Sequence, residues 1–285
     1  MLYNIMNLSG SIGYTLLSKN NKKILIFADA HSDVEYCKDN FIKISDFFNK
    51  LLNNNNYQIL LEEVNRNNVE LNELWPGSEH IQNLKDLYLK NKNKIIPIDI
   101  RPNFYKFSWE VFLDEKYKKF GEMKLIDYLE NLNLFFFKDK KENDKYKLKL
   151  NENIKNLIIN QDYYEVLKKN FEKLKKLYLD YLKKYDNFLN KKLIDIYNID
   201  QTVFHLLDKI LSSVMEWYSN LVILTTNKIS ILHAGLFHSR EIVKNLIKDF
   251  KFNVEENYGI TIFPSFNLKS CVILSKKMLE SINLS

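Results

Sequence analysis

Three short segments of this sequence combine acidic side chains with imidazole or guanidinium groups, which bind metals and transfer protons in proteins. The segments are Asp29-Ala-His31-Ser-Asp33, Asp99-Ile-Arg101 and His233-Ala-Gly-Leu-Phe-His238. Histidine and arginine are otherwise rare in this lysine-rich chain, which has five histidines and three arginines. Their concentration in a few segments predicts one shared polar site.

The first segment offers a set of metal ligands. If the preceding strand continues, Asp29, His31 and Asp33 point to the same side and present one imidazole nitrogen and two carboxylates. This set suits manganese, zinc or iron better than calcium. The other interpretation is a turn in which the two aspartates cap the next helix.

The last segment places a glycine and a histidine between an expected strand and an expected helix. Gly235 permits a tight turn, and His238 then falls near the N-terminus of the helix. The helix dipole there favours the neutral imidazole, which ligates a metal or acts as a base. Arg240 would clamp an anionic group or pair with a carboxylate. The alternative is that His233 belongs to the core and Arg240 to the surface.

Further charged side chains follow other expected strands. Glu62 and Glu63 leave one strand in opposite directions because of the pleat, and we favour Glu63 for the site because it lies further beyond the strand. Asp99 and Arg101 stand two residues apart on an extended segment, so we expect an ion pair that positions Asp99. Asp208, on a helix before the next strand, is a further candidate for the site.

The pattern of apolar residues predicts the elements that position these side chains. Apolar, β-prone runs predict strands at residues 13–17, 23–27, 57–61, 94–98, 229–232, 259–263 and 270–274. Periodic apolar residues predict helices at residues 41–52, 80–89 and 240–250, and throughout residues 104–224. Alternating strands and helices predict an α/β fold with a central, mostly parallel sheet flanked by helices.

This order of elements also predicts the domain organisation. Residues 1–103 and 225–285 would form the two halves of one α/β domain, and residues 104–224 would be a helical insertion that caps the sheet. Ligands of open α/β sheets bind beyond the carboxyl ends of the strands. Each of the predicted site segments follows such an end, so we expect them to converge.

Composition excludes several other classes of protein. Hydrophobic residues make up 46% of the chain and charged residues 27%, as in ordinary globular proteins. The formal charge is +6, but the lysines alternate with acids along expected helices, which gives no strong signal of nucleic-acid binding. No apolar run is long enough to cross a membrane, and no signal peptide is evident, so a cytoplasmic protein is expected. Cys37 and Cys271 are expected to be buried thiols and not a disulfide framework.

Two families resemble these motifs. Residues 29–33 resemble the metal-binding motif of the arginase and agmatinase ureohydrolases, which hold two manganese ions, but the other two motifs of those enzymes are absent. The order of all the motifs is similar to the superfamily of TIKI and TraB proteins, erythromycin esterase and ChaN-like proteins. There, two Gly-x-x-His motifs flank a glutamate, an Asp-Arg-like element and a helical insertion. The counterparts here are Ala28–His31, Glu62 or Glu63, Asp99 with Arg101, and Gly235–His238.

This second resemblance implies a metal-dependent hydrolase of a peptide, ester or related bond, acting on a small molecule or a peptide. Asp29, His31 and His238 would hold a divalent manganese, zinc or iron ion, Glu63 would be the general base, and Arg101 or Arg240 would stabilise negative charge. Ala28 departs from the glycine of the first motif. The chain also resembles proteins of large double-stranded DNA viruses, which implies a viral origin and a location in the host cytoplasm or the virion. The alternative is a non-enzymatic viral structural or host-interaction protein with a degenerate site.

Overall fold

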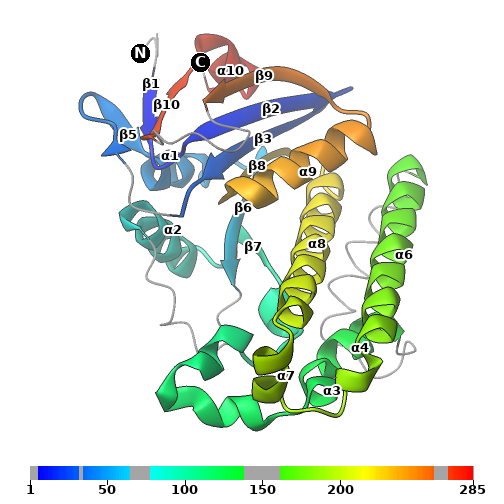
Figure 1. The fold of residues 1–285 in the computed structure, drawn as a ribbon. Coiled ribbons are helices and arrows are strands. Elements are labelled where there is room, and N and C mark those ends of the chain that lie inside the picture. Colours follow the sequence, from blue (N-terminus) through cyan, green and yellow to red (C-terminus); the bar gives the residue numbers. More distant parts are fainter. Residues whose placement is uncertain (1–5, 32–34, 65–77, 138–160, 260–268, 285) are drawn as a thin grey trace. The chain divides into compact units, whose positions relative to one another are not determined.

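The computed structural model describes residues 6–31, 35–64, 78–137, 161–259 and 269–284, which divide into two compact units (Figure 1). The sheet unit contains the described residues up to Ile98 and those from Val222 onward. The helical unit contains the described residues between Asp99 and Leu221. The fold is mixed α/β, and its sheets are mostly parallel and flanked by helices, as the sequence predicts.

The sheet unit is built on a six-stranded sheet with the strand order β7-β6-β8-β3-β2-β9. These strands are β2 (Gly13–Lys19), β3 (Lys22–Asp29), β6 (Tyr57–Val64), β7 (Ile95–Asp99), β8 (Ile229–Gly235) and β9 (Asn253–Gly259). Strand β8 pairs in parallel with both β3 and β6, whereas β2 forms an antiparallel hairpin with β3. The central strands are uninterrupted apolar runs because both faces of the sheet are covered.

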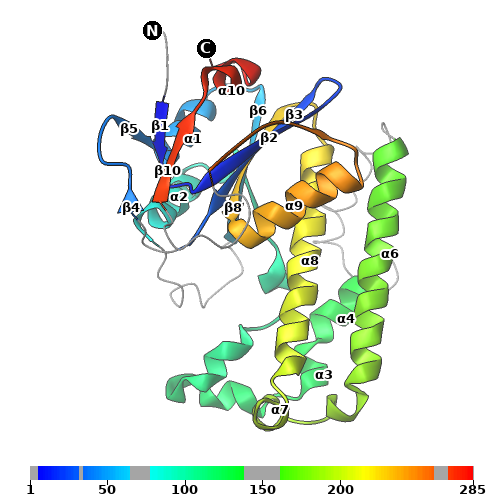
Figure 2. The ribbon, with the colours of Figure 1, turned by 45° about the horizontal axis from the view of Figure 1, so that its top comes forward.

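The pleat of β3 sends successive side chains to opposite faces of this sheet. Phe27 packs against Phe47 and Phe48 of α1 (Ile44–Leu51), whereas Ala28 packs with Leu236 at the start of α9 (Leu236–Lys248). Helices α1 and α9 therefore cover opposite faces, as Figures 1 and 2 show. The α1 face also carries α2 (Glu79–Lys90) and α10 (Lys276–Ser281), whose apolar residues join the same core.

A second, four-stranded sheet lies in the same unit, with the order β4-β10-β1-β5. Its strands are β1 (Met6–Ser9), β4 (Glu35–Tyr36), β5 (Phe41–Lys43) and β10 (Lys269–Leu274). The helix expected over residues 41–52 therefore begins later, at Ile44, because its first residues pair with β1. Strand β9 ends at Gly259, and the remainder of the strand predicted at 259–263 lies outside the described residues.

The two cysteines correct one expectation from the sequence. Cys37 and Cys271 form a disulfide, with their Cα atoms 5.0 Å apart and a sequence separation of 234. The sequence does not predict this pairing, because the two cysteines are far apart in it. Cys37 follows β4 and Cys271 lies on β10, and these two strands become neighbours only in the folded sheet. Disulfides persist mainly in oxidising surroundings.

The helical unit has its own aromatic core. Its 3-10 helices are η3 (Arg101–Asn103), η4 (Trp109–Leu113), η5 (Glu115–Glu122) and η6 (Asp186–Phe188). Its α-helices are α3 (Leu125–Tyr128), α4 (Glu130–Phe137), α6 (Gln161–Lys184), α7 (Leu193–Ile199) and α8 (Thr202–Leu224), the last of which ends in the sheet unit. Fully buried Phe204, Tyr178 and Leu193 belong to one cluster. No helix in the described part of the chain has the length and apolar character needed to cross a bilayer.

Candidate functional site

The carboxyl ends of three parallel strands bring three distant parts of the sequence together. In the β3–β8 ladder Asp29 lies opposite Gly235, and in the β6–β8 ladder Leu61 lies opposite His233. Glu62, the next residue of β6, therefore comes beside the end of β8. The predicted convergence of the first and last segments at one rim of the sheet is what the strand register produces.

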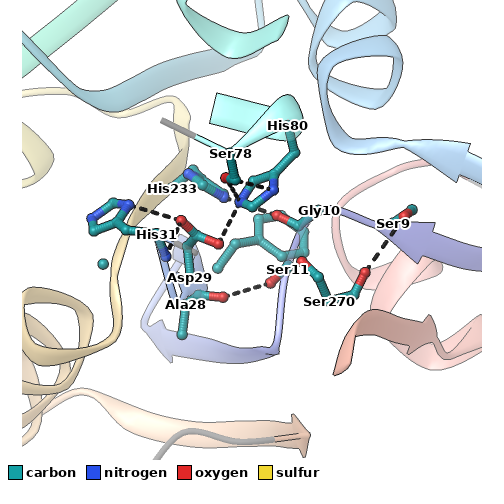
Figure 3. Close-up of polar contacts among 12 residues, drawn as sticks. Ser9, Gly10, Ser11, Ala28, Asp29, His31, Ser78, His80, His233 and Ser270 are labelled. Atoms are coloured by element: carbon teal, nitrogen blue, oxygen red, sulfur yellow. Dashed lines mark hydrogen bonds and ion pairs between the residues drawn. The ribbon is translucent and has the colours of Figure 1, made fainter. Parts of the chain in front are cut away.

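Asp29 is the centre of this group of polar side chains, and its carboxylate is completely buried. Its Oδ2 accepts hydrogen bonds from the backbone N–H of His31, at 2.9 Å, and from His31 Nδ1, at 2.8 Å. Its Oδ1 lies 2.6 Å from Nε2 of His80 (Figure 3). Burial alone would raise the pKa of Asp29, but the hydrogen bonds from His31 and His80 outweigh it and hold the pKa well below its ordinary value.

His31 bridges Asp29 to a second carboxylate. Its Nε2 lies 3.3 Å from Oε2 of Glu62, so that both ring nitrogens face carboxylate oxygens. Burial would lower the pKa of His31, but the hydrogen bonds to Asp29 and Glu62 prevail and raise it. The backbone of His31 has φ +55°, a left-handed conformation that non-glycine residues adopt at an energetic cost. The two contacts with Asp29 stabilise this conformation, and the side chain remains 45% exposed to solvent.

Glu62 joins β6 to the start of α9. The backbone N–H of Gly235 donates to Glu62 Oε2 at 2.7 Å, and Nε2 of His238 lies 3.6 Å from Oε1. Gly235 leaves no room for a side chain, because a Cβ there would lie 2.4 Å from His31 Nε2. The sequence analysis favoured Glu63, but Leu61 faces the α1 core, so the pleat directs Glu62 towards α9 and Glu63 away from it.

His80, at the start of α2, is a site residue that the sequence did not reveal. It is 5% exposed, and its Nδ1 lies 3.1 Å from the hydroxyl of Tyr36 and 3.0 Å from that of Ser78. Ser78 precedes α2 but makes no capping hydrogen bond with its side chain, so its hydroxyl serves the imidazole instead. The only signal in the sequence was a histidine two residues after a helix-capping serine, which reads equally well as a surface position.

His233 lies beneath the site and not in it. The residue is 2% exposed, and its Nε2 lies 3.1 Å from the carbonyl oxygen of Gly10. Its ring contacts those of Phe48 and His80 edge-to-face. Burial lowers the pKa of His233 to about 4, although the negative charge of Asp29 acts in the opposite direction. His233 is therefore a neutral histidine of the core that supports the site from below.

Other predicted residues make their contacts elsewhere. Glu63 is buried and accepts from the backbone N–H of Val64, and the guanidinium of Arg240 lies 3.4 Å from Glu241. Asp33 lies outside the described residues. Three further predicted residues, Asp99, Arg101 and Asp208, belong to the helical unit.

Within the helical unit the expected ion pair is present. Arg101 donates from Nε and Nη2 to the two oxygens of Asp99, each at 2.8 Å. Asp208 accepts a hydrogen bond from the indole of Trp109 at 2.8 Å, and burial raises the pKa of Asp208 although that hydrogen bond lowers it. These contacts give both carboxylates a partner inside their own unit.

The side chains at the strand ends include donor types that also occur in metal sites. His31, Glu62 and His238 provide two imidazoles and one carboxylate, which is a donor set that zinc enzymes use. However, no group of three or more histidine, cysteine, aspartate or glutamate side chains has the spacing of metal ligands among the residues that the structure describes. Asp29, which the sequence suggested as a ligand, has both oxygens engaged by His31 and His80.

Comparison of this chain with protein-family models, with curated proteins and with solved structures finds no match. The chemistry of the site is therefore deduced from its own geometry. Two carboxylates enclose a charged imidazole, and a second imidazole contacts the same carboxylate. Paired imidazoles in different electrostatic surroundings are suited to acid–base catalysis.

Proposed function

We propose that this protein is a hydrolase of an ester, amide or related bond, with its acid–base centre at the ends of β3, β6 and β8. The observation that carries the proposal is that one carboxylate, Glu62, contacts the imidazoles of His31 and His238. His31 follows β3, Glu62 lies on β6 and His238 on α9, and the side chains of Glu62 and His238 are nearly buried. An ion pair that only stabilises the fold needs one acidic and one basic side chain, whereas Glu62 contacts two imidazoles.

His31 is suited to the role of the acid in this proposal. Its contacts with Asp29 and Glu62 raise its pKa, so that it carries a positive charge near neutral pH. A positively charged imidazole that is still exposed to solvent can stabilise the negative charge that develops on a substrate oxygen and can then protonate the leaving group.

His238 is suited to the role of the base. It lies in the first turn of α9, and its Nε2 lies 3.6 Å from Oε1 of Glu62. An imidazole that a carboxylate orients can accept a proton from an attacking water molecule. Glu62 would orient both imidazoles, and the N–H of Gly235 fixes the carboxylate in turn.

A divalent metal remains part of the hydrolase hypothesis through the resemblance to the TIKI, TraB and erythromycin esterase superfamily. The groups that would hold it are His31, Glu62 and His238, and such an ion would activate a bound water molecule. Because the described residues contain no group with metal-ligand spacing, the roles given above use only the protein's own side chains. Elemental analysis of protein purified without chelator tests for the ion directly.

Hydrolysis of chromogenic esters and fluorogenic peptide amides tests the proposal, with the variants His31→Gln, Glu62→Gln and His238→Gln. We expect each to lower the rate by roughly a hundredfold or more, because each removes an acid, a base or the group that orients both. His205→Gln, an exposed histidine of the helical unit, is the matched control and should retain the wild-type rate. Equal rates in all four variants would show that any hydrolysis has another origin.

The non-catalytic alternative, a viral structural or host-interaction protein, predicts a different outcome. The same contacts would then stabilise the fold, so that the three variants lower the unfolding temperature while the wild type shows no turnover. A viral origin, a location in the host cytoplasm or the virion, and the helical insertion at residues 104–224 as a cap remain parts of the proposal that rest on the sequence.

A further inference from the structure

The disulfide and the candidate site are connected through adjacent residues on both sides of the bridge. Cys37 directly follows Tyr36, whose hydroxyl lies 3.1 Å from Nδ1 of His80. Cys271 lies opposite Ser9 in the β1–β10 ladder, one residue before Gly10, whose carbonyl oxygen lies 3.1 Å from Nε2 of His233. Cys37 is therefore next to a residue that contacts a buried imidazole, and Cys271 lies across the ladder from the neighbour of another such residue.

Strand β4 is a short strand at the edge of the small sheet. It consists of two residues, Glu35 and Tyr36, which pair with Lys269 and Ser270 of β10. The ion pairs of Glu35 with Lys38 and Lys269 join exposed side chains and contribute little to stability. The disulfide continues the register of this ladder by one position and ties the end of β4 to β10.

Tyr36 is linked to Asp29 and His31 by a series of side-chain contacts through His80. The rings of Tyr36 and His80 meet edge-to-face, with their centroids 5.7 Å apart. His80 in turn contacts Oδ1 of Asp29, whose other oxygen holds both the backbone and the ring of His31. Figure 3 shows the inner part of this chain, from His80 through Asp29 to His31.

We propose that the Cys37–Cys271 disulfide is a redox clamp, which holds Tyr36 against His80 and so sets the orientation of Asp29 and His31. Reduction would release the two-residue strand β4 and withdraw the tyrosine hydroxyl from the imidazole. As a means of regulating hydrolysis, this clamp rests on the function proposed above.

The clamp would open by thiol–disulfide exchange with a thiol reductant. A thiolate of the reductant attacks the sulfur of Cys271, the more exposed of the two, forms a mixed disulfide and releases Cys37, which takes up a proton. A second thiolate attacks the reductant's sulfur in the mixed disulfide and releases Cys271, which is protonated likewise. Two electrons and two protons pass to the cysteine pair, and the reductant leaves as a disulfide.

Imidazole NMR of the full-length chain tests the clamp without depending on catalysis. The chain has five histidines, so every ring can be assigned by single substitutions. Intact mass confirms the redox state, because reduction adds two hydrogens. We expect reduction to shift the signals of His80 and His31 and to leave those of His205, in the helical unit, unchanged.

Two variants sharpen this experiment. Tyr36→Phe keeps the ring and the disulfide but removes the hydroxyl that contacts His80. It should therefore shift the His80 signals as reduction does, and reduction of this variant should cause little further shift. The double variant Cys37→Ser with Cys271→Ser should give the spectrum of the reduced wild type, and adding reductant should not change that spectrum. Any of three results would overturn the clamp. The purified chain forms no disulfide, the His80 signals do not shift when the disulfide is reduced, or the signals of all five histidines shift to a similar extent.

Rates of hydrolysis measured on the same samples separate the two proposals. We expect reduction to slow hydrolysis by roughly tenfold, because a displaced catalytic group loses its alignment. A redox-dependent His80 signal without any hydrolysis would reject the proposed function and retain the clamp. Hydrolysis that depends on His31 but not on the disulfide would reject regulation by the clamp.

Discussion

Asp29 determines the geometry of the candidate site because one buried carboxylate makes contacts with two imidazoles. It also accepts the backbone N–H of His31 and so supports that residue's left-handed backbone. An anion buried among hydrogen-bond donors is stable only while its partners remain, and each imidazole is oriented only while the anion remains. The side chain therefore couples the local backbone conformation to the charge of the site.

Asp29→Asn tests this coupling, because the amide keeps the size of the side chain and removes its charge. We expect the free energy of unfolding to fall by about 3 kcal/mol, as when one partner of a buried ion pair is removed. The pKa of His31 should fall as well, since the contact with Asp29 helps to raise it. Urea unfolding and NMR titration measure the two effects. Asp46→Asn, on the exposed part of α1, is the control and should change neither.

Gly235→Ala should damage the site more than the fold. The added methyl group would lie 2.4 Å from His31 Nε2 and 3.3 Å from Glu62 Oε2, so the imidazole must move. Because His31 is half exposed, it can swing into solvent while Asp29 keeps its contacts with His80 and the backbone N–H of His31, so we expect the free energy of unfolding to fall by only about 1–2 kcal/mol. Hydrolysis should slow by roughly tenfold to a hundredfold.

Gly121→Ala is the control for this substitution, since its methyl group would also be crowded, 3.0 Å from Ile194, but in the helical unit. It should leave the rate of hydrolysis unchanged. An unaltered rate in Gly235→Ala as well would mean that the position of His31 has no bearing on the reaction.

The buried His233 should make the protein sensitive to mild acid. Its pKa falls from an ordinary value of 6.5 to about 4 in the fold, so between these values the unfolded chain binds a proton that the folded chain does not. The contribution of His233 to stability is therefore complete above pH 6.5 and is lost as the pH falls towards 4, by about 3 kcal/mol. Below pH 6.5 His31 is protonated in both the folded and the unfolded state, because its pKa is raised in the fold, so it contributes little slope there.

Urea unfolding of the wild type and of His233→Asn, across this pH range, measures the contribution. The slope of stability against pH should be flatter in the variant. Parallel slopes in the two proteins would mean that His233 is protonated in the folded state too, contrary to its complete burial.

Three residues of the candidate site could be predicted from the sequence because they follow recognisable strands. Strand ends are visible in a sequence, and the residues beyond them, Asp29, His31 and His238, converge because the register of the ladders brings them together. His80 and Tyr36 were not predicted because their contacts arise from the packing of α2 and β4, which no local pattern encodes. The sequence could not decide between Glu62 and Glu63, because it does not show which residues of β6 face α1 and which face α9.

At the scale of elements, length decided which strands were predicted. Strands β3, β6 and β8 have seven or eight residues and long apolar runs, because they are covered on both faces. Strands β1, β4 and β5 have two to four residues, too few for any periodicity, and they exist through their pairing with one another and with β10. The small sheet and its disulfide are thus products of tertiary contacts.

The turn between β2 and β3 is fixed to the start of β8 by one lysine. Nζ of Lys22 lies 2.7 Å from the carbonyl oxygen of Thr226, 2.8 Å from that of Lys228 and 3.1 Å from Oγ of Ser230. These three bonds join segments about two hundred residues apart in the sequence. They hold the beginning of β8 in its register beside β3.

Lys22→Met should therefore weaken this junction, because it leaves two carbonyl groups without the ammonium or amine that donates to them. We expect a loss of about 1–3 kcal/mol in the free energy of unfolding, measured with urea. Lys38→Met removes a lysine from an exposed ion pair and is the control, with a change of less than about 1 kcal/mol. Equal effects of the two substitutions would mean that the partly buried junction contributes no more than a surface contact.

At the scale of the whole molecule, the main hydrophobic cores of the two units differ in composition. The sheet unit buries mainly aliphatic side chains with a few phenylalanines and tyrosines, whereas the helical unit buries a dense group of tyrosines, phenylalanines and tryptophan. Among the described residues, the hydroxyl of buried Tyr181 in the helical core has no hydrogen-bond partner. Units with separate cores need not lose their structure at the same denaturant concentration.

Phe204→Ala tests this independence, because Phe204 is fully buried in the helical core between Trp109 and Phe112. The cavity should lower the stability of the helical unit by about 3–5 kcal/mol. Imidazole NMR in urea reports the units separately, through His205 in one and His80 in the other. We expect the His205 transition to move to lower urea while that of His80 moves much less. An equal displacement of both would mean that α8, which ends in the sheet unit, makes the two cores unfold as one.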